Sequence, residues 1–137
     1  MVKAVIIEDN VECVKYLNKI LEKFPQIKIV GEPATCIKDS IELINTKKPA
    51  MVFLSLGLND GTNRDGFIAL NMAEYRDYHV IIFTAQILEE NYKESYKSAF
   101  YGTRSVRYIP KLSDDGVLKD AIKYCCSKLS TSRHKDT

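Results

Sequence analysis

The stretch that decides the fold is VFLSLGL, residues 52–58. It opens with a short apolar run, as in a strand buried on both faces, and passes Ser55 into the turn-rich residues 59–61 (NDG). Together with the residues before it, this run predicts a strand over residues 50–54. In a parallel sheet such a strand ends at the edge where ligands bind. Ser55 is therefore a candidate site residue.

Four other short runs of apolar and β-branched residues predict further strands, at residues 3–7, 27–30, 80–83 and 106–109. Apolar residues at helical spacing lie between and after them, at residues 14–24, 37–44, 66–72, 89–101 and 117–129. This alternation is typical of a parallel sheet covered on both faces. We predict an α/β fold: a doubly wound, five-stranded parallel sheet in a (βα)5 flavodoxin-like three-layer sandwich.

The composition is that of an ordinary globular domain, with 137 residues, 45% of them hydrophobic and 28% charged. We predict one domain over residues 1–130 and a polar C-terminal tail over residues 131–137, with fraying from about residue 127. The net charge of +2 is too small to indicate nucleic-acid binding. No apolar run reaches the roughly 20 residues of a membrane span, and no signal-peptide pattern opens the chain. We expect a cytoplasmic protein.

The cysteines and histidines offer little chemistry. No two of the four cysteines form a CxxC pair, so reduced thiols are expected. Cys125 and Cys126 fall in a predicted helix, where only one can face the core, although a redox pair is an alternative. His79 and His134 are too few for a histidine-based metal or thiol site.

Polar side chains stand at the ends of four predicted strands. Glu8 and Asp9 follow the first, Ser55 ends the third, Thr84 follows the fourth, and Lys111 comes after the fifth. Singly, such residues are often structural, since an acid pair also suits the start of a helix. The carboxyl ends of parallel strands share one edge, so the five side chains should converge there. This convergence predicts a functional site.

These residues are similar to those of a known family. The chain resembles the receiver domain of bacterial response regulators, which accepts phosphate from histidine kinases. The resemblance rests on AVIIEDN (residues 4–10), VGEPATCIKDSIELINTKKPAMVFLSLGLNDG (30–61), IIFTA (81–85) and YIPK (108–111). It covers about residues 2–128, and the second and third blocks are most similar to receivers that precede LytTR-type DNA-binding domains.

The resemblance implies a role for each residue at this edge. Glu8 and Asp9 would hold Mg²⁺ together with the backbone carbonyl of Gly57, since this hard cation prefers oxygen ligands. Thr84 would hydrogen-bond a phosphoryl oxygen, and Lys111 would supply a cation to the same group.

The resemblance also implies a partner face made by the fourth helix, fifth strand and fifth helix. Tyr108 would be the aromatic residue whose rotation follows Thr84 and reports the state of the site. Tyrosines that stay exposed make good interface anchors, and the candidates are Tyr92, Tyr96 and Tyr101. We expect a histidine kinase or effector protein as partner, or a homodimer through this face, and neither nucleic acid nor membrane.

Ser55 stands where the family has its phosphoacceptor aspartate. A carboxylate can attack a phosphohistidine directly, whereas a serine hydroxyl needs a base, and no histidine lies near this edge. The loss of one carboxylate should also weaken Mg²⁺ binding and leave Lys111 facing fewer acids. We predict a degenerate receiver, fixed in one conformation, that acts by protein contacts and not as an enzyme.

Smaller departures affect two loops. The loop from Ser55 to Gly66 is longer than usual, with NRD (residues 63–65) as the apparent insert, and Asn59 stands where a proline is common. Leu112 replaces the proline that normally follows the lysine, so only the Ile109–Pro110 bond could be cis.

Two alternatives stay open. In the first, a serine kinase phosphorylates Ser55, or a small ligand binds in the crevice. In the second, the chain is a small Mg²⁺-dependent phosphotransfer or hydrolase enzyme on a similar sheet. Against the second, the first strand lacks a DxD arrangement and no nucleophilic aspartate is available.

Overall fold

Five parallel strands form the centre of the fold. In the computed structural model, residues 1–58, 64–85 and 88–136 are described, with side chains through residue 129. The strands pair in the order β2-β1-β3-β4-β5. Their bounds are β1 (Val2–Ile7), β2 (Ile27–Ile29), β3 (Met51–Leu54), β4 (His79–Thr84) and β5 (Ser105–Pro110). The predicted doubly wound sheet of flavodoxin-like order is confirmed.

Helices connect the strands along the described chain. Their bounds are α1 (Val11–Leu21), α2 (Ile37–Lys47), α3 (Asp65–Met72), α4 (Tyr92–Ser95), α5 (Lys97–Phe100) and α6 (Asp115–Asp136). α1 begins after Asn10, whose side chain accepts a hydrogen bond of 3.0 Å from the backbone N–H of Cys13. α2 ends at Lys48 in the left-handed conformation, and Pro49 follows.

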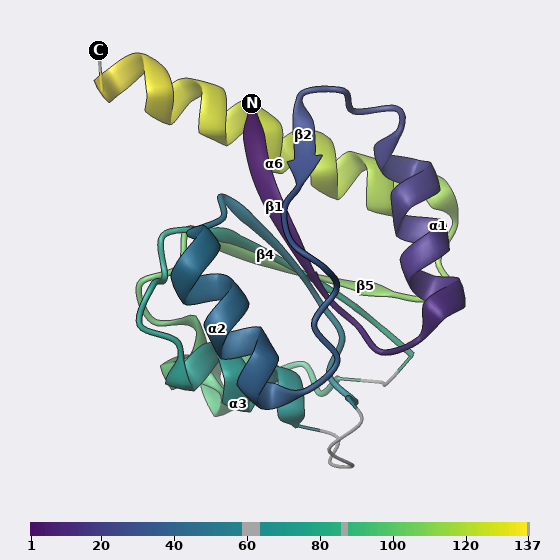
Figure 1. Ribbon diagram of the computed structural model, residues 1–137, viewed down its shortest axis with the longest axis vertical. Helices are drawn as coiled ribbons and strands as arrows, with labels where there is room; N and C mark the ends of the chain where they lie inside the picture. The colour runs from purple at the N-terminus through teal and green to yellow at the C-terminus, as the bar shows by residue number, and fades with distance from the viewer. Residues whose placement is uncertain (59–63, 86–87, 137) are drawn as a thin grey trace.

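The core has two halves, one on each face of the sheet. In β1, Ala4 and Ile6 belong to one half, whereas Val5 and Ile7 belong to the other, because successive strand residues point to opposite faces. Figure 1 shows the layers: α1 and α6 cover one face, while α2 and α3 cover the other. Among the described residues, no helix is both long and apolar enough to cross a bilayer.

The helix predicted over residues 89–101 is instead two short helices, α4 and α5. The break falls at Tyr96, whose φ of −117° and ψ of 29° leave the helical range. Its ring stacks on Phe67 with centroids 4.2 Å apart, and the guanidinium of Arg64 lies over the same ring at 5.2 Å. This contact with α3 overrides the helical spacing. Gly102 follows with a φ of +83°, as predicted for a left-handed cap.

The structure adds detail at the C-terminal end and in one loop. α6 runs to Asp136 and projects beyond the body of the fold (Figure 1), so residues 131–136 of the predicted polar tail are helical. No proline or glycine follows Gly116 to stop it. Asp65, which was predicted to belong to the loop insert, is the first residue of α3. Asn59 and Asn63 lie outside the described residues.

The Ile109–Pro110 bond is trans, and the described chain contains no cis peptide. Pro110 occupies the last position of β5 and cannot donate to β4. The backbone N–H of Lys111 donates to the carbonyl of Thr84 instead, at 3.0 Å. This hydrogen bond holds the start of the following loop against the end of β4.

The guanidinium of Arg76 joins the ends of two helices. It donates to the carbonyl of Asn71 in α3 at 2.6 Å, and to those of Ser98 and Tyr101 around α5 at 2.9 and 3.2 Å. Helix ends leave such carbonyls without intrahelical partners, and a cation there satisfies them.

Arg76→Ala should therefore lower the free energy of unfolding by about 2 kcal/mol, because several carbonyls lose a charged donor. Arg76→Lys should recover only part of this, since an ammonium group cannot reproduce the guanidinium fork. Urea unfolding followed by circular dichroism measures both variants. Lys38→Ala, at an exposed position of α2, is the control and should change stability by less than about 0.5 kcal/mol. An Arg76→Ala protein as stable as its parent would rule out this clamp.

Candidate functional site

The carboxyl ends of the strands bring the predicted residues to one rim. Ile7 at the end of β1 lies opposite Leu54 of β3, and Leu54 lies opposite Ile82 of β4. The residues that follow these strands therefore start from neighbouring positions. Ser55 is fixed there by its backbone N–H, which donates to the carbonyl of Ile7 at 2.8 Å.

Glu8 is the best-anchored side chain at the rim and is only 3% exposed. Its Oε2 accepts hydrogen bonds of 3.1 Å from the backbone N–H groups of Asp9 and Asn10. Its Oε1 lies 2.8 Å from the ammonium of Lys111. Burial raises the pKa of the Glu8 carboxyl, but Lys111, the Cys13 thiol and the Asn10 N–H outweigh it and hold that pKa below its ordinary value. Glu8 is therefore charged at neutral pH.

Lys111 reaches into the rim with its side chain 23% exposed. Burial lowers the pKa of its ammonium, yet the Glu8 carboxylate more than compensates and the pKa lies above its ordinary value. The pair thus keeps both charges. Beside it, burial and the Glu8 carboxylate raise the pKa of Cys13 to about 12, so this thiol stays protonated.

Asp9 is the second acid at the rim and forms no ion pair with the described residues. Burial and the neighbouring Glu8 carboxylate raise the pKa of Asp9 above its ordinary value. The pKa values of the two acids are therefore shifted in opposite directions: Lys111 helps to lower that of Glu8, whereas burial and the Glu8 carboxylate raise that of Asp9.

Ser55 and Thr84 are both buried, at 5% and 2% exposure. The hydroxyl of Ser55 makes no hydrogen bond with a described residue. Gly66 in the first turn of α3 packs directly against it: its backbone N–H donates to Leu56 O at 3.1 Å, and a Cβ there would lie 2.5 Å from Ser55 O. The start of α3 therefore closes over the segment that carries Ser55.

Asp65 is a buried acid that the sequence reasoning missed. Its carboxylate is fully buried in the first turn of α3, next to Gly66. The sequence alone places Asp65 in a loop insert, because the loop from Ser55 to Gly66 is longer than usual. An Asp immediately before a helical apolar run is a helix-start signal, and this could have placed it in α3.

The residues predicted for Mg²⁺ do not fit the cation as they are arranged. Asp9 and Gly57 are half-buried at the rim, but both carboxylate oxygens of Glu8 already face protein donors. Within the described ranges, no group of three His, Cys, Asp or Glu side chains could hold a metal ion. The ammonium of Lys111 stands against Glu8 where a cation would bind.

The predicted partner-face tyrosines lie in different surroundings. Tyr92 and Tyr108 are half-buried and meet edge to face, with ring centroids 6.0 Å apart. Tyr96 is half-buried against Phe67, whereas Tyr101 is 80% exposed.

A groove of about 690 Å³ runs along β5 between α4 and α6. Sequence reasoning did not include Arg107 and Tyr124, which also line it. The guanidinium of Arg107 lies 4.0 Å from the centre of the Tyr124 ring, and the ammonium of Lys128 lies 5.5 Å from it. The groove is thus aromatic and cationic. It is lined by Tyr92, Lys93, Ser105, Val106, Arg107, Tyr108, Ile109, Val117 and Tyr124.

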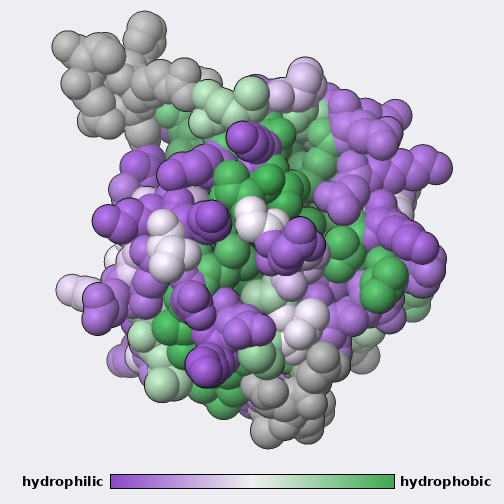
Figure 2. All heavy atoms as spheres, in the orientation of Figure 1, coloured by the Kyte–Doolittle hydropathy of each residue, from purple (hydrophilic) through white to green (hydrophobic). Residues whose placement is uncertain are grey.

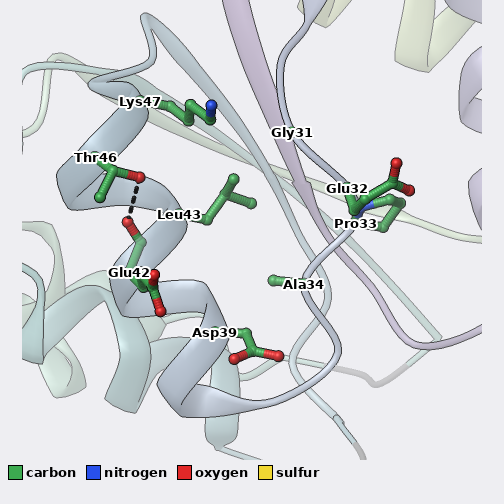
Figure 3. Close-up of a pocket in the computed structure, with 9 residues that line it drawn as sticks. All are labelled: Gly31, Glu32, Pro33, Ala34, Asp39, Glu42, Leu43, Thr46 and Lys47. Carbon is green, nitrogen blue, oxygen red and sulfur yellow. Dashed lines mark hydrogen bonds between the residues drawn. The ribbon is translucent and has the colours of Figure 1, made fainter.

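A second groove, of about 380 Å³, lies beside α2 and carries the opposite charge. Figure 3 shows Leu43 projecting from α2 into it, with Glu32 across the groove and Asp39 and Glu42 on the helix side. Gly31 has a φ of +75°, and a Cβ there would meet Leu43 Cδ1 at 2.6 Å. On this side of the molecule, apolar side chains gather in the centre of the face and hydrophilic ones surround them (Figure 2).

Comparison with known sequences gives a partial match. No protein-family model matches the chain. Sensory transduction protein LytT of Bacillus anthracis is 33% identical over 60 residues, which are 44% of this chain and 24% of that protein. LytT of Bacillus cereus is 32% identical over a segment of the same length. The match thus spans about a quarter of the length of these relatives. It agrees with the predicted similarity to LytTR-type receivers.

Comparison with solved structures covers nearly the whole chain. A two-component response regulator from Clostridium difficile has a TM-score of 0.73 and 21% identity, over 94% of this chain and 98% of that one. The response regulator domain of Thermotoga maritima CheB gives 0.69 and 17%, over 93% and 95%. The BeF3-activated receiver domain of Klebsiella pneumoniae RstA gives 0.66 and 20%, over 89% and 96%. The chain therefore has the fold of a CheY-like response-regulator receiver domain.

Proposed function

We propose that the chain is a receiver-like module of two-component signalling whose rim does not carry aspartate-type phosphotransfer and which acts by protein contacts. The observation that carries this proposal is the ion pair between Lys111 and buried Glu8 beside Ser55. The lysine that the receiver resemblance assigns to the phosphoryl group is here engaged by an acid of the protein itself.

The chemistry of Ser55 supports the same conclusion. Its hydroxyl would need a base, and the depressed pKa of Glu8 makes that carboxylate a poor one. Glu8 would also have to release Lys111 and two backbone N–H groups to accept the proton. At 5% exposure, Ser55 is equally poorly placed for a serine kinase, which disfavours phosphorylation as the mode of regulation.

The same ion pair favours a single resting conformation. A two-state domain changes state only when a ligand binds one state more tightly, by roughly 5 kcal/mol for a complete shift. In a receiver the phosphoryl group supplies that difference, and Ser55 offers no carboxylate to carry it. A domain held in this way signals by presenting one fixed surface to a partner.

The groove along β5 is the surface that we assign to the partner, a histidine kinase or an effector protein. It contains Tyr92, one of the predicted partner-face tyrosines, and Tyr108, the predicted switch aromatic, whereas Tyr96 and Tyr101 do not line it. Its remaining lining joins α4 to α6. Tyrosine and arginine are among the side chains that are enriched as anchors of protein interfaces. A homodimer through this face is the alternative occupant.

A phosphodonor experiment tests the proposal. The protein is incubated with Mg²⁺ and acetyl phosphate and its intact mass is measured, with Ser55→Asp as the matched variant. We expect no phosphate adduct on the parent chain and an adduct on Ser55→Asp, because the new carboxylate supplies the nucleophile, adds an oxygen ligand for Mg²⁺ and competes with Glu8 for Lys111. An adduct on the parent would overturn the proposal of a silent site. Absence of an adduct on both would remove the chemical basis for placing this rim in two-component signalling.

A further inference from the structure

The groove along β5 exposes main chain as well as side chains. β5 comes last in the strand order, and within residues 1–58, 64–85 and 88–136 it pairs only with β4, so its other edge has no strand partner there. Five consecutive residues of this strand, 105–109, line the groove. α4 forms one wall through Tyr92, and α6 forms the other through Val117 and Tyr124. The groove is therefore a channel with a strand edge as its floor.

The pairing of β5 shows which backbone groups face the channel. The N–H of Arg104 donates to the carbonyl of Tyr78 at 2.8 Å, on the β4 side. Successive backbone groups of a strand point to opposite edges. The N–H and C=O groups of Ser105, Arg107 and Ile109 consequently point away from β4. Such a row of backbone groups is a template for another extended chain.

The side chains around this edge are cationic and favour a negatively charged ligand. Lys93 and Arg107 line the channel, and none of the described residues that line it is acidic. Lys128 adds a further cation beside Tyr124. Arg107 guards the edge against pairing with basic strands, because a like charge opposes it. Carboxylates would meet Arg107 and Lys93, and apolar side chains would meet the tyrosine rings.

We infer that this channel binds an extended acidic segment of the partner protein, which adds to the free edge of β5 as a sixth strand. Backbone hydrogen bonds to Ser105, Arg107 and Ile109 supply affinity, and alternate side chains of the segment contact the α4 and α6 walls. The inference rests on the proposed function only in placing the partner at this face.

The test uses the full 137-residue chain and a fluorescein-labelled octapeptide of alternating Glu and Val, at low ionic strength. Three further peptides are compared with it: one with Lys in place of Glu, and two with N-methyl groups on alternate backbone nitrogens, in opposite registers. Fluorescence anisotropy should show binding of the acidic peptide and not of the basic one. One N-methylated register should lose binding and the other should keep it, since only one edge of an added strand faces β5.

Two variants with the same change of charge show whether the peptide binds at this channel. Arg107→Glu should weaken binding of the acidic peptide by roughly tenfold or more, because a carboxylate then faces carboxylates. Lys38→Glu makes the same charge change at an exposed position of α2 and should leave binding unchanged. Circular dichroism confirms that both variants are folded.

Three outcomes would overturn strand addition. These are equal binding of both N-methylated peptides, equal binding of the basic peptide, and a chain that dimerises through this face and ignores every peptide. None of them alters the phosphodonor result at Ser55, so failure of this inference is distinguishable from failure of the proposed function.

Discussion

Lys111→Met should lower the free energy of unfolding by about 3 kcal/mol at pH 7, because it leaves the Glu8 carboxylate buried without its cation. Glu8→Gln should cost less, about 1 kcal/mol, because the amide oxygen still accepts the backbone N–H groups of Asp9 and Asn10. Lys111, at 23% exposure, can also turn its ammonium toward water when its partner is gone. A larger loss of stability in Lys111→Met than in Glu8→Gln would identify Glu8 as the buried member of the ion pair.

The pH dependence of this loss has a definite sign. The pKa of Glu8 in the folded chain lies below its ordinary value of 4.5, so its stabilisation is present above pH 4.5 and is lost as the pH falls through the folded pKa. The pKa of Lys111 lies above its ordinary value of 10.5, so its stabilisation is present below pH 10.5 and is lost as the pH rises through the folded pKa. In Lys111→Met, burial still raises the pKa of Glu8, and the Lys111 cation no longer opposes it. The deficit of this variant should therefore shrink as the pH falls from 7 toward 4.

Urea unfolding at several pH values measures these effects, and a double variant isolates the pair. Glu8→Gln/Lys111→Met should be more stable than Lys111→Met alone, because it no longer contains an unpaired buried charge. Lys97→Met removes a member of the exposed pair with Glu94 and should cost less than about 0.5 kcal/mol. A Lys111→Met protein that loses no more than this control would show that the ion pair at the rim is not a buried one.

The positions of the rim residues could be predicted because each follows from the residues next to it in the sequence. Each strand is a short apolar run, and a polar residue marks its end, so Glu8, Ser55 and Thr84 could be placed by reading strand ends alone. The parallel sheet then brings those ends together, whichever helices cover it. The pairing of Lys111 with Glu8 could not be read in this way, since it depends on the path of the loop after Pro110.

The groove and the broken helix depend on contacts between distant segments. The spacing of Tyr92, Tyr96 and Phe100 is helical, and only the ring of Phe67 in α3 reveals why the helix breaks at Tyr96. Arg107 and Tyr124 likewise belong to separate elements, and their stacking follows from the packing of α6 beside β5. Propensity describes one segment at a time, so tertiary contacts of this kind lie beyond it.

Gly66→Ala should lower the free energy of unfolding by about 3 kcal/mol, a large effect for one methyl group. The added Cβ would lie 2.5 Å from Ser55 O and 3.0 Å from Leu54 Cδ1. Ser55 cannot retreat easily, because its N–H is bonded to Ile7 O at 2.8 Å, within the pairing of β1 and β3. α3 must therefore shift away from the strand end. The shift would stretch the 3.1 Å hydrogen bond from Gly66 N to Leu56 O.

Gly116→Ala provides the matched control, since both glycines lie in the first turn of a helix and neither has a positive φ. A Cβ at Gly116 would meet only the Asp114 carboxylate, at an ordinary 3.5 Å. The substitution should raise stability by about 0.5 kcal/mol, because alanine favours the helix and restricts the unfolded chain. Thermal and urea unfolding should thus move in opposite directions for the two variants. If both glycines tolerated alanine equally, the close packing of α3 on the Ser55 segment would be refuted, and Ser55 would be more accessible to solvent and kinases than its burial indicates.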